Sequence, residues 1–394
     1  MKWVHKGHEY DEYFEQILKR YKSAIYIFGY GLVGKKLYEN LKRYKICKGF
    51  IDNNEALYEH IHDGKQIMSL QDYFLKGSLN NSYIVITASA KNQLVIAEQL
   101  KTHGLVHGKH YFFYQEFNER ILPIIAAYQF NETYVPLAQI SVTERCTLKC
   151  KKCAHACYAV DNKAEDMLLA EVYKSADCFF SKVDYIEEFV LIGGEPLLYK
   201  QLAEAIEYIG KKYRKQMQIF CITTNGTIVP TEEVLKLCVK YNVLFRISNY
   251  TRELPQLENH HKRLIEMLEN YGISYVLAKP EIEWMDYGFE YVNRENIEAD
   301  LIKVFSSCNT PCREVRGNRY YYCVMARSVS ENLGYDLGKD DYLDLNLLDG
   351  KDYKKELLEF NLGYSEKGYL DMCRRCHGND AKNYPIPVAE QVKK

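Results

Sequence analysis

The chain has 394 residues, of which 52 are Lys or Arg and 53 are Asp or Glu, so its formal net charge is −1. This balance gives no indication of a nucleic-acid partner or of an anionic membrane surface. The length favours two or three domains. The N-terminus lacks the apolar stretch of a signal peptide, and no window is apolar enough to span a membrane, so we expect a cytoplasmic protein without nucleic-acid or membrane partners. In that compartment, 13 cysteines indicate metal ligands or redox chemistry rather than disulfides.

The first 120 residues alternate predicted strands and helices. A helical lead-in over residues 1–22 precedes strands at Ile25–Phe28, Gly49–Ile51 and Tyr83–Thr87, and a helix runs through Lys35–Arg43. Such alternation predicts a small parallel sheet of Rossmann type, and we take residues 1–120 as the first domain.

A glycine-rich turn joins the first of these strands to its helix. Gly29, Gly31 and Gly34 have the spacing of the Rossmann dinucleotide-binding fingerprint, and Asp52 ends the next strand about 20 positions on. The helix N-terminus favours a phosphate. The domain is similar to small Rossmann-like modules fused to bacterial enzymes of glycan and nucleotide-sugar modification. Nucleotide or nucleotide-sugar binding is therefore one interpretation, and a structural or docking role is the other.

A second strand–helix series occupies residues 136–290. Amphipathic helices separate its predicted strands, which predicts a full or partial parallel (β/α) barrel. In such barrels the chemistry lies at the carboxyl ends of the strands. The predicted strands are Ala138–Val142, Phe189–Ile192, Gln218–Thr223, Leu244–Ser248 and Ser274–Leu277.

Three cysteines follow the first barrel strand. Cys146, Cys150 and Cys153 form a C-x3-C-x2-C motif, which chance alone would give roughly 0.01 times in such a chain. Three thiolates on one loop can bind three irons of a four-iron cluster and leave the fourth iron open. On the cysteines alone, a zinc site with His155 or Cys157 as fourth ligand is the alternative.

Further motifs follow the later barrel strands in a fixed order. Together with the cysteines, these motifs resemble those of the radical S-adenosylmethionine (SAM) superfamily. One residue departs from the family pattern: the position before the third cysteine is usually aromatic, and here it is Lys152. The resemblance implies a catalytic [4Fe–4S] cluster on the three cysteines, with SAM contacted by backbone at the glycine loop and by polar groups at the next strand ends. The implied cofactor-binding residues are Gly193, Gly194, Glu195, Pro196, Thr224, Asn225, Arg246 and Ser248.

The resemblance also implies a reaction. SAM is cleaved reductively to methionine and a 5′-deoxyadenosyl radical, which removes a hydrogen atom from the substrate, while the protein supplies orientation. An electron donor such as flavodoxin or ferredoxin is expected. We expect a small-molecule substrate, a sugar or a nucleotide-linked sugar, that is oxidised or epimerised. A peptide or protein maturase is the second hypothesis, and a non-enzymatic iron–sulfur redox sensor is the third.

The last part of the chain, residues 291–394, contains a second set of cysteines and a Tyr-rich hairpin-like segment at Asn318–Tyr322. It resembles the twitch domain, a shortened relative of the SPASM domain, and implies one auxiliary [4Fe–4S] cluster for which five cysteines compete. A structural zinc site is the alternative. The remaining Cys47, Cys178, Cys221 and Cys238 are expected to be core residues. The five competing cysteines are Cys308, Cys312, Cys323, Cys373 and Cys376.

Overall fold

The computed structural model describes residues 1–19, 24–76, 81–280, 283–295 and 297–392. They form two compact units, a small one made of Gly7–Tyr134 and a large one made of Met1–Lys6 together with Val135–Lys394. The first six residues therefore belong with the large unit. Residues 136–290 and 291–394 share that unit, so a domain boundary at residue 290 stays a prediction. No helix within the described ranges is long and apolar enough to cross a membrane.

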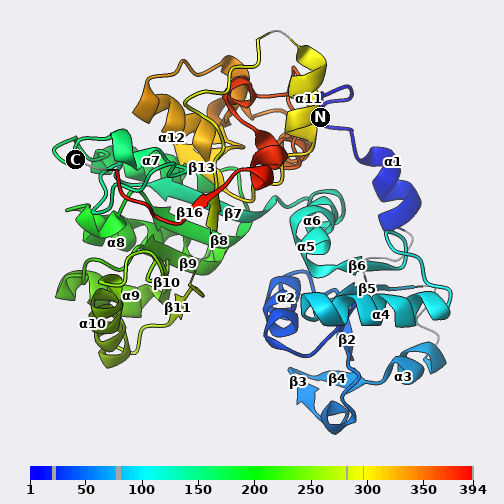
Figure 1. Ribbon diagram of the computed structural model, residues 1–394. Coiled ribbons are helices and arrows are strands. Elements are labelled where there is room, and N and C mark those ends of the chain that lie inside the picture. The colour runs from blue at the N-terminus through cyan, green and yellow to red at the C-terminus, as the bar shows by residue number, and fades with distance from the viewer. Residues whose placement is uncertain (20–23, 77–80, 281–282, 296, 393–394) are drawn as a thin grey trace. The chain divides into compact units, whose positions relative to one another are not determined.

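The small unit is built on a six-stranded sheet with the order β3-β4-β2-β1-β5-β6 (Figure 1). All pairings are parallel except that of β3 with β4. Strand β5 is buried along its whole length, as a central strand covered on both faces should be. The small parallel sheet predicted from the sequence is therefore present. Its strands are β1 (Ile25–Phe28), β2 (Cys47–Ile51), β3 (Ile61–His62), β4 (Lys65–Met68), β5 (Tyr83–Ile86) and β6 (Tyr111–Phe113).

Two helices of the small unit start at residues that suit an N-cap. Gly31 precedes α2 in an extended conformation, and Ser69 forms a capping box with Asp72 at the start of α3. The predicted lead-in helix over residues 1–22 is shorter than expected. It consists of α1 (Asp11–Tyr13) and a π-helical turn (Phe14–Leu18), and its last predicted residues lie outside the described ranges. The other helices are α2 (Leu32–Lys42), α3 (Leu70–Leu75), α4 (Ala90–Thr102), α5 (Tyr114–Glu116) and α6 (Leu122–Phe130).

The large unit contains an eight-stranded sheet with the order β11-β10-β9-β8-β7-β13-β14-β15. The recorded pairings from β8 to β11 and between β7 and β13 are parallel, and helices connect the successive strands. This is the mixed α/β fold with a partial parallel barrel that the sequence predicts. Its elements are β7 (Tyr134–Ser141), α7 (Leu169–Phe180), β8 (Tyr185–Ile192), α8 (Leu202–Tyr213), β9 (Met217–Thr224), α9 (Glu232–Tyr241), β10 (Val243–Ile247), α10 (Leu257–Asn270) and β11 (Tyr275–Leu277).

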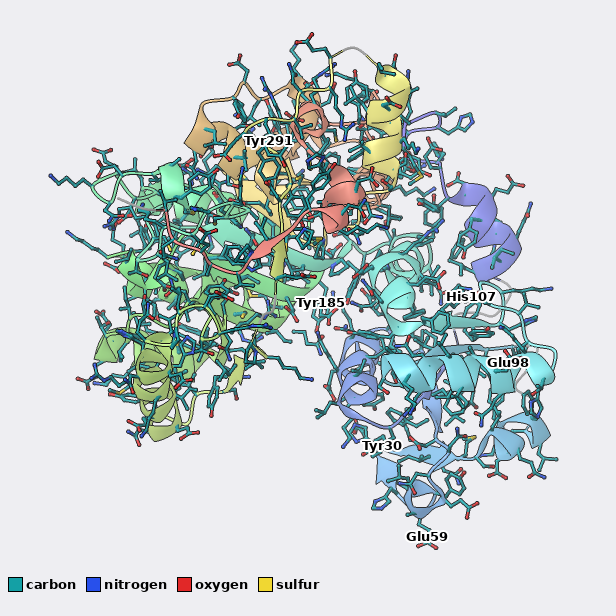
Figure 2. All side chains as sticks on the ribbon, viewed as in Figure 1. Tyr30, Glu59, Glu98, His107, Tyr185 and Tyr291 are labelled. Carbon is teal, nitrogen blue, oxygen red and sulfur yellow. The ribbon has the colours of Figure 1, made fainter. Side chains whose placement is uncertain are left out.

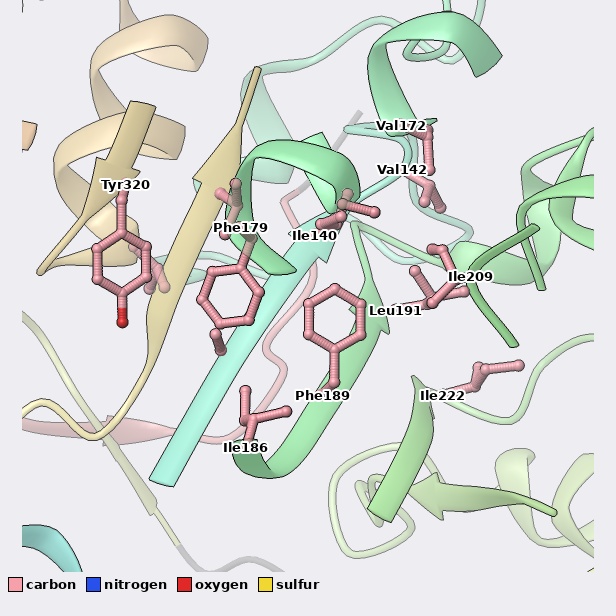
Figure 3. Close-up of a cluster of buried hydrophobic side chains, with 14 of the residues drawn as sticks. Ile140, Val142, Val172, Phe179, Ile186, Phe189, Leu191, Ile209, Ile222 and Tyr320 are labelled. Atoms are coloured by element: carbon pink, nitrogen blue, oxygen red, sulfur yellow. The ribbon is translucent and has the colours of Figure 1, made fainter. Parts of the chain in front are cut away.

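The core of the large unit lies between the strands and the helices that cover them. Figure 3 shows Ile140 of β7, Phe179 of α7, Phe189 of β8, Ile222 of β9 and Tyr320 of the C-terminal part within one buried cluster. Burying each such side chain contributes about 1.5–3 kcal/mol. The core therefore continues without a break from the barrel into the C-terminal part of the chain.

The C-terminal part extends the barrel sheet and adds helices around it. Strand β13 joins β7 and turns through Gly317, at φ 60°, into antiparallel β14, which confirms the predicted hairpin. A separate antiparallel pair, β12 with β16, brings residues 283–285 beside residues 385–387. The elements are β12 (Glu283–Met285), α11 (Glu298–Ser306), β13 (Arg313–Arg316), β14 (Arg319–Tyr321), α12 (Val324–Leu333), β15 (Tyr342–Asp344), α13 (Tyr353–Asn361) and β16 (Pro385–Pro387).

Candidate functional site

The loop that carries the first three cysteines follows β7 and is fixed at its start by a partly buried ion pair. The guanidinium of Arg145 donates from Nε and Nη2 to the two carboxylate oxygens of Asp166, at 2.9 and 2.6 Å. Thr143 Oγ1 donates to the same carboxylate at 2.6 Å, and Arg145 also donates to the carbonyl of Leu198 at 3.0 Å. No sequence pattern indicated this arrangement, because Asp166 lies 21 residues from Arg145 in an irregular segment.

The glycine loop after β8 packs directly on the cysteine loop. A methyl group on Gly193 would lie 2.3 Å from the carbonyl oxygen of Thr143, and one on Gly194 would lie 2.3 Å from that of Arg145. Two backbone hydrogen bonds join the loops, from Gly194 N to Thr143 O and from Glu195 N to Arg145 O, at 2.8 and 2.9 Å. The glycines are thus required for contact between two loops. Their contact with SAM stays a prediction.

Glu195 is fully buried and braces the glycine loop against the end of β9. Its carboxylate accepts hydrogen bonds from Thr224 Oγ1, at 2.8 and 2.9 Å, and from the backbone amides of Asn225 and Leu197, at 2.8 and 3.1 Å. Burial raises the pKa of Glu195 to about 7. Glu195 and Thr224, two predicted cofactor-binding residues, are hydrogen-bonded to each other and so connect the glycine loop to β9. Pro196, also buried, opens the short 3-10 helix Pro196–Leu198.

Asn225 connects the end of β9 to the cysteine loop. Its Nδ2 donates to Thr147 Oγ1 at 3.0 Å and to Cys146 Sγ at 3.6 Å. Its Oδ1 accepts from the backbone amide and hydroxyl of Thr227, at 3.0 and 2.7 Å, which fixes the amide orientation. Of the predicted polar residues, Asn225 is therefore in contact with a cysteine sulfur.

Arg246 and Ser248 lie at the end of β10. The Arg246 guanidinium forms an ion pair with Glu188 of β8, across the inner surface of the sheet. Ser248 donates its backbone amide to Thr224 O at 2.9 Å. The resemblance implies that both residues contact SAM, which stays a prediction. In the structure, the partner of the Arg246 guanidinium is the carboxylate of Glu188.

The three thiols of the cysteine loop lie close enough to affect one another electrostatically. Burial is the main cause that raises the pKa of Cys146 to about 11 and that of Cys150 to about 12, and the other cysteines of the loop add to both shifts. A hydrogen bond from the Cys157 thiol lowers the pKa of Cys153 to about 6, although burial opposes this shift.

A donor set of three convergent thiols fits an iron–sulfur cluster. Among the described residues, no group of three or more His, Cys, Asp or Glu side chains is arranged to hold a metal ion. The fit to a cluster rests on the chemistry of the donor set, three thiols on one loop.

Lys152, which departs from the family pattern, ties the cysteine loop to residues 286–291. Its backbone is left-handed, at φ 57°. Its ammonium group forms ion pairs with Glu290 and, at 3.5 Å, with Asp286, and lies 5.1 Å from the centre of the Tyr291 ring. Tyr291 is labelled in Figure 2. Lys152 therefore connects the cysteine loop to residues 286–291 through ion pairs, at the position where the family pattern has an aromatic residue.

Four of the five C-terminal cysteines line one cavity of about 260 Å³, together with apolar side chains such as Phe305. Burial raises the pKa of Cys376 to about 11, with Cys308 contributing, and burial together with Cys308 and Cys376 raises that of Cys323. Cys312 does not line the cavity. Burial is the main cause that raises the pKa of Tyr287, a residue of the cavity lining, and Cys376, Cys308, Cys323 and Cys312 add to that shift, so Cys312 lies near the set although it is outside the lining. The cysteines of the cavity are Cys308, Cys323, Cys373 and Cys376.

The glycine turn of the small unit borders a cavity of about 310 Å³ lined by Gly29, Asp52, Asn53 and Asn92, among others. It lies beyond the carboxyl ends of β1 and β5, where the strand order reverses and doubly wound folds bind ligands.

The turn itself explains part of the glycine fingerprint. Gly29 has φ 116°, and a methyl group on Gly34 would lie 2.1 Å from Gly29 O, whereas Gly31 faces open space. The Asp52 carboxylate accepts the backbone amides of Tyr30 and Asn54, at 2.7 and 2.9 Å. Asp52 therefore holds the turn, and its part in nucleotide binding stays a prediction.

Comparisons with known proteins find relatives of the barrel part of the chain. Residues 140–250 match the model of the radical SAM superfamily. A GTP 3′,8-cyclase of Stenotrophomonas maltophilia is 25% identical over 173 residues, which are 39% of this chain and 51% of the relative. The molybdenum cofactor biosynthesis protein 1 of Dictyostelium discoideum is 34% identical over 102 residues, 26% of this chain and 15% of the relative. The chain thus spans about half the length of the first relative and less of the second.

Solved structures give a weaker likeness. BtrN in complex with AdoMet and 2-DOIA has a TM-score of 0.38 and 15% identity, covering 66% of this chain and 98% of BtrN. Native anSMEcpe with bound AdoMet has a TM-score of 0.30 and 20% identity, covering 36% of this chain and 43% of that protein. With TM-scores this low, neither likeness bears on the substrate of this chain.

Proposed function

We propose that the chain is an enzyme that cleaves SAM reductively and removes a hydrogen atom from a small-molecule substrate, because residues 140–250 match the model of the radical SAM superfamily. The ligands of the catalytic [4Fe–4S] cluster in this proposal are Cys146, Cys150 and Cys153. With SAM bound, such a cluster supplies a 5′-deoxyadenosyl radical. The electron that starts the reaction comes from a donor such as flavodoxin or ferredoxin.

The observation that carries the proposal is the contact of three loops at the carboxyl end of the barrel. The glycine loop touches the cysteine loop through two backbone hydrogen bonds, and Asn225 reaches Cys146 Sγ from the end of β9. The hydrogen bonds of Glu195 and the ion pair between Arg145 and Asp166 fix the positions of these loops. Such preorganisation fixes the positions of reacting groups, and misplacements of about 1 Å can cost 10²-fold in rate.

We also propose an auxiliary [4Fe–4S] cluster in the C-terminal cavity, bound by Cys308, Cys323, Cys373 and Cys376. The cavity gathers these thiols among apolar side chains, and Cys323 stands at the N-cap of α12, whose dipole favours an anionic group. Cys312 has no part in it. A structural zinc site remains the competing assignment, and metal analysis separates the two.

The substrate class that we propose is a sugar or a nucleotide-linked sugar, which is oxidised or epimerised. The cavity at the switch point of the small unit, which is lined by Gly29, by Asp52 and by the first turns of α4, suits the nucleotide end of such a molecule. The names of several relatives contain GTP, which is a nucleotide. A peptide or protein maturase is the second candidate, because twitch-like and SPASM-like regions are common in such enzymes. A redox sensor is the third, and the match of residues 140–250 to the radical SAM model disfavours it, because a sensor needs no SAM site.

The test uses the full chain after anaerobic reconstitution with iron and sulfide. Release of 5′-deoxyadenosine from SAM under a strong reductant is measured with panels of nucleotide sugars and of peptides. We expect nucleotide sugars to stimulate release and to bind by calorimetry. Gly31→Val should weaken that binding, because the added side chain would occupy the open space at the start of α2 where a phosphate is expected. The variant should keep its iron, because the added side chain meets no neighbouring atom. Stimulation by peptides alone would favour the maturase, and no SAM cleavage at all would refute the enzyme proposal.

A further inference from the structure

A segment near the C-terminus runs along the loop of catalytic cysteines. The backbone amide of Lys151 donates to Glu390 O at 2.6 Å, and that of Val392 donates to Lys149 O at 2.8 Å. Cys150 and Gln391 thereby form an antiparallel bridge, although 241 residues separate them. We call residues 388–392 the tail strap.

The side chain of Gln391 is held in one orientation over the Cys150 sulfur. Its Oε1 accepts the backbone amide of Lys149 at 2.8 Å, and its Nε2 donates to Ala389 O at 2.6 Å. The same Nε2 donates to Cys150 Sγ at 3.2 Å. Because the first two bonds assign the oxygen and the nitrogen of the amide, the group that faces the sulfur is an N–H donor.

The tail strap is anchored on the N-terminal side of this contact. Val388 and Ala389 are fully buried and pack in one cluster with Cys150, Leu254 and Leu257. Strand β16, immediately before the strap, pairs with β12. The amide of Gln391 therefore reaches the sulfur from a fixed backbone.

We propose that Gln391 is a positioning residue that tunes the catalytic cluster through a hydrogen bond to the Cys150 thiolate. This inference rests on the proposed function. Hydrogen bonds to cysteine sulfurs are one of the factors that set the reduction potential of an iron–sulfur cluster. An N–H donor stabilises negative charge on the sulfur, and the reduced cluster carries one more negative charge than the oxidised one. Gln391 therefore makes the cluster easier to reduce.

The experiment is a potentiometric titration of the reconstituted full chain, followed by electron paramagnetic resonance. The catalytic signal is identified by its change when SAM is added. Gln391→Met removes the donor while keeping a side chain of similar length. We expect the iron content to stay and the reduced-to-oxidised ratio at a fixed potential to fall about tenfold, a shift of about 59 mV for a one-electron couple.

Two further variants control the result. Glu390→Gln breaks only the half-exposed ion pair with Lys151 in the same strap, so its potential should match that of the wild type. Gln391→Glu keeps an acceptor for Lys149 N and removes the donor to sulfur, so its potential should also fall.

The outcomes are distinct. Retained iron with an unchanged potential in Gln391→Met overturns the inference. Loss of iron from both Gln391 variants, with iron kept in Glu390→Gln, also overturns it, since Gln391 would then hold the loop without tuning it. If the wild type itself binds no cluster on the three loop cysteines, the proposed function fails instead.

Discussion

Replacing Gly194 with Ala tests the contact between the glycine loop and the cysteine loop. The added methyl group would lie 2.3 Å from Arg145 O and 2.9 Å from Cys146 Cβ, whereas ordinary contact begins at 3.4 Å. The sequence alone suggests that a side chain here would obstruct SAM. The structure places the loop of Cys146 in the same space, so the substitution should displace a cluster ligand as well.

The cost follows from the bonds that join the loops. Relieving the clash requires a movement of about 1 Å, which breaks the bonds from Gly194 N to Thr143 O and from Glu195 N to Arg145 O. Each such bond contributes about 1 kcal/mol. Overpacking of a well-packed site adds about 1–3 kcal/mol. We therefore expect the native loop arrangement to lose about 3–5 kcal/mol.

The assay is iron content together with 5′-deoxyadenosine release after anaerobic reconstitution. Gly194→Ala should lose the catalytic cluster and its activity and retain about four irons, those of the auxiliary site. The matched control is Gly31→Ala, because that methyl group enters open space and should leave about eight irons. Wild-type iron and wild-type release in Gly194→Ala would refute the argument from loop contact.

Two further predictions concern the C-terminal part of the large unit. Cys323→Ser should remove about four irons and Cys312→Ser none, so equal iron loss in both would contradict the separation of Cys312 from the cavity. Arg327→Met should lower the free energy of unfolding in denaturant by about 3–5 kcal/mol, because it leaves the carboxylates of Glu144 and Glu314 buried without their cation. Although burial opposes it, Arg327 holds the pKa of Glu144 below its usual value, so the loss should be complete near neutral pH and shrink as the pH falls through the carboxylate range. The control is the exposed Arg319→Met, expected within about 0.5 kcal/mol of the wild type.

The strands that carry the motifs were predictable because they are short apolar runs that end in polar or glycine turns. The strand predicted at Gln218–Thr223 is Met217–Thr224 in the structure, and the one predicted at Ile25–Phe28 has those bounds. A local run of residue types is sufficient for such a prediction, since strand formation and the burial of the strand depend on the same side chains.

The contacts that support the site could not be predicted in this way. Gln391 meets Cys150 across 241 residues, and Arg327 meets Glu144 across 183. Neither pair has a periodicity or spacing that a sequence pattern could reveal. The sequence likewise does not show which of the five C-terminal cysteines line the cavity, because the side-chain direction of Cys312 depends on the fold of the segment before β13. Glu195 of the glycine motif was expected to bind the cofactor. Its position in the motif could not show that its carboxylate is buried and hydrogen-bonded to the protein.

The two units are joined by the chain at two points, because Gly7–Tyr134 lies between two pieces of the large unit. Trp3 donates its Nε1 to Glu359, 356 residues later, and Trp3 N donates to Ser365 O. On a ribosome that adds roughly 5–20 residues per second, residues 1–6 wait roughly 20–70 s for these partners, and the small unit can fold in the meantime. Residues 1–6 are therefore synthesised well before the residues that they contact, and they are among the last parts of the large unit to reach their place.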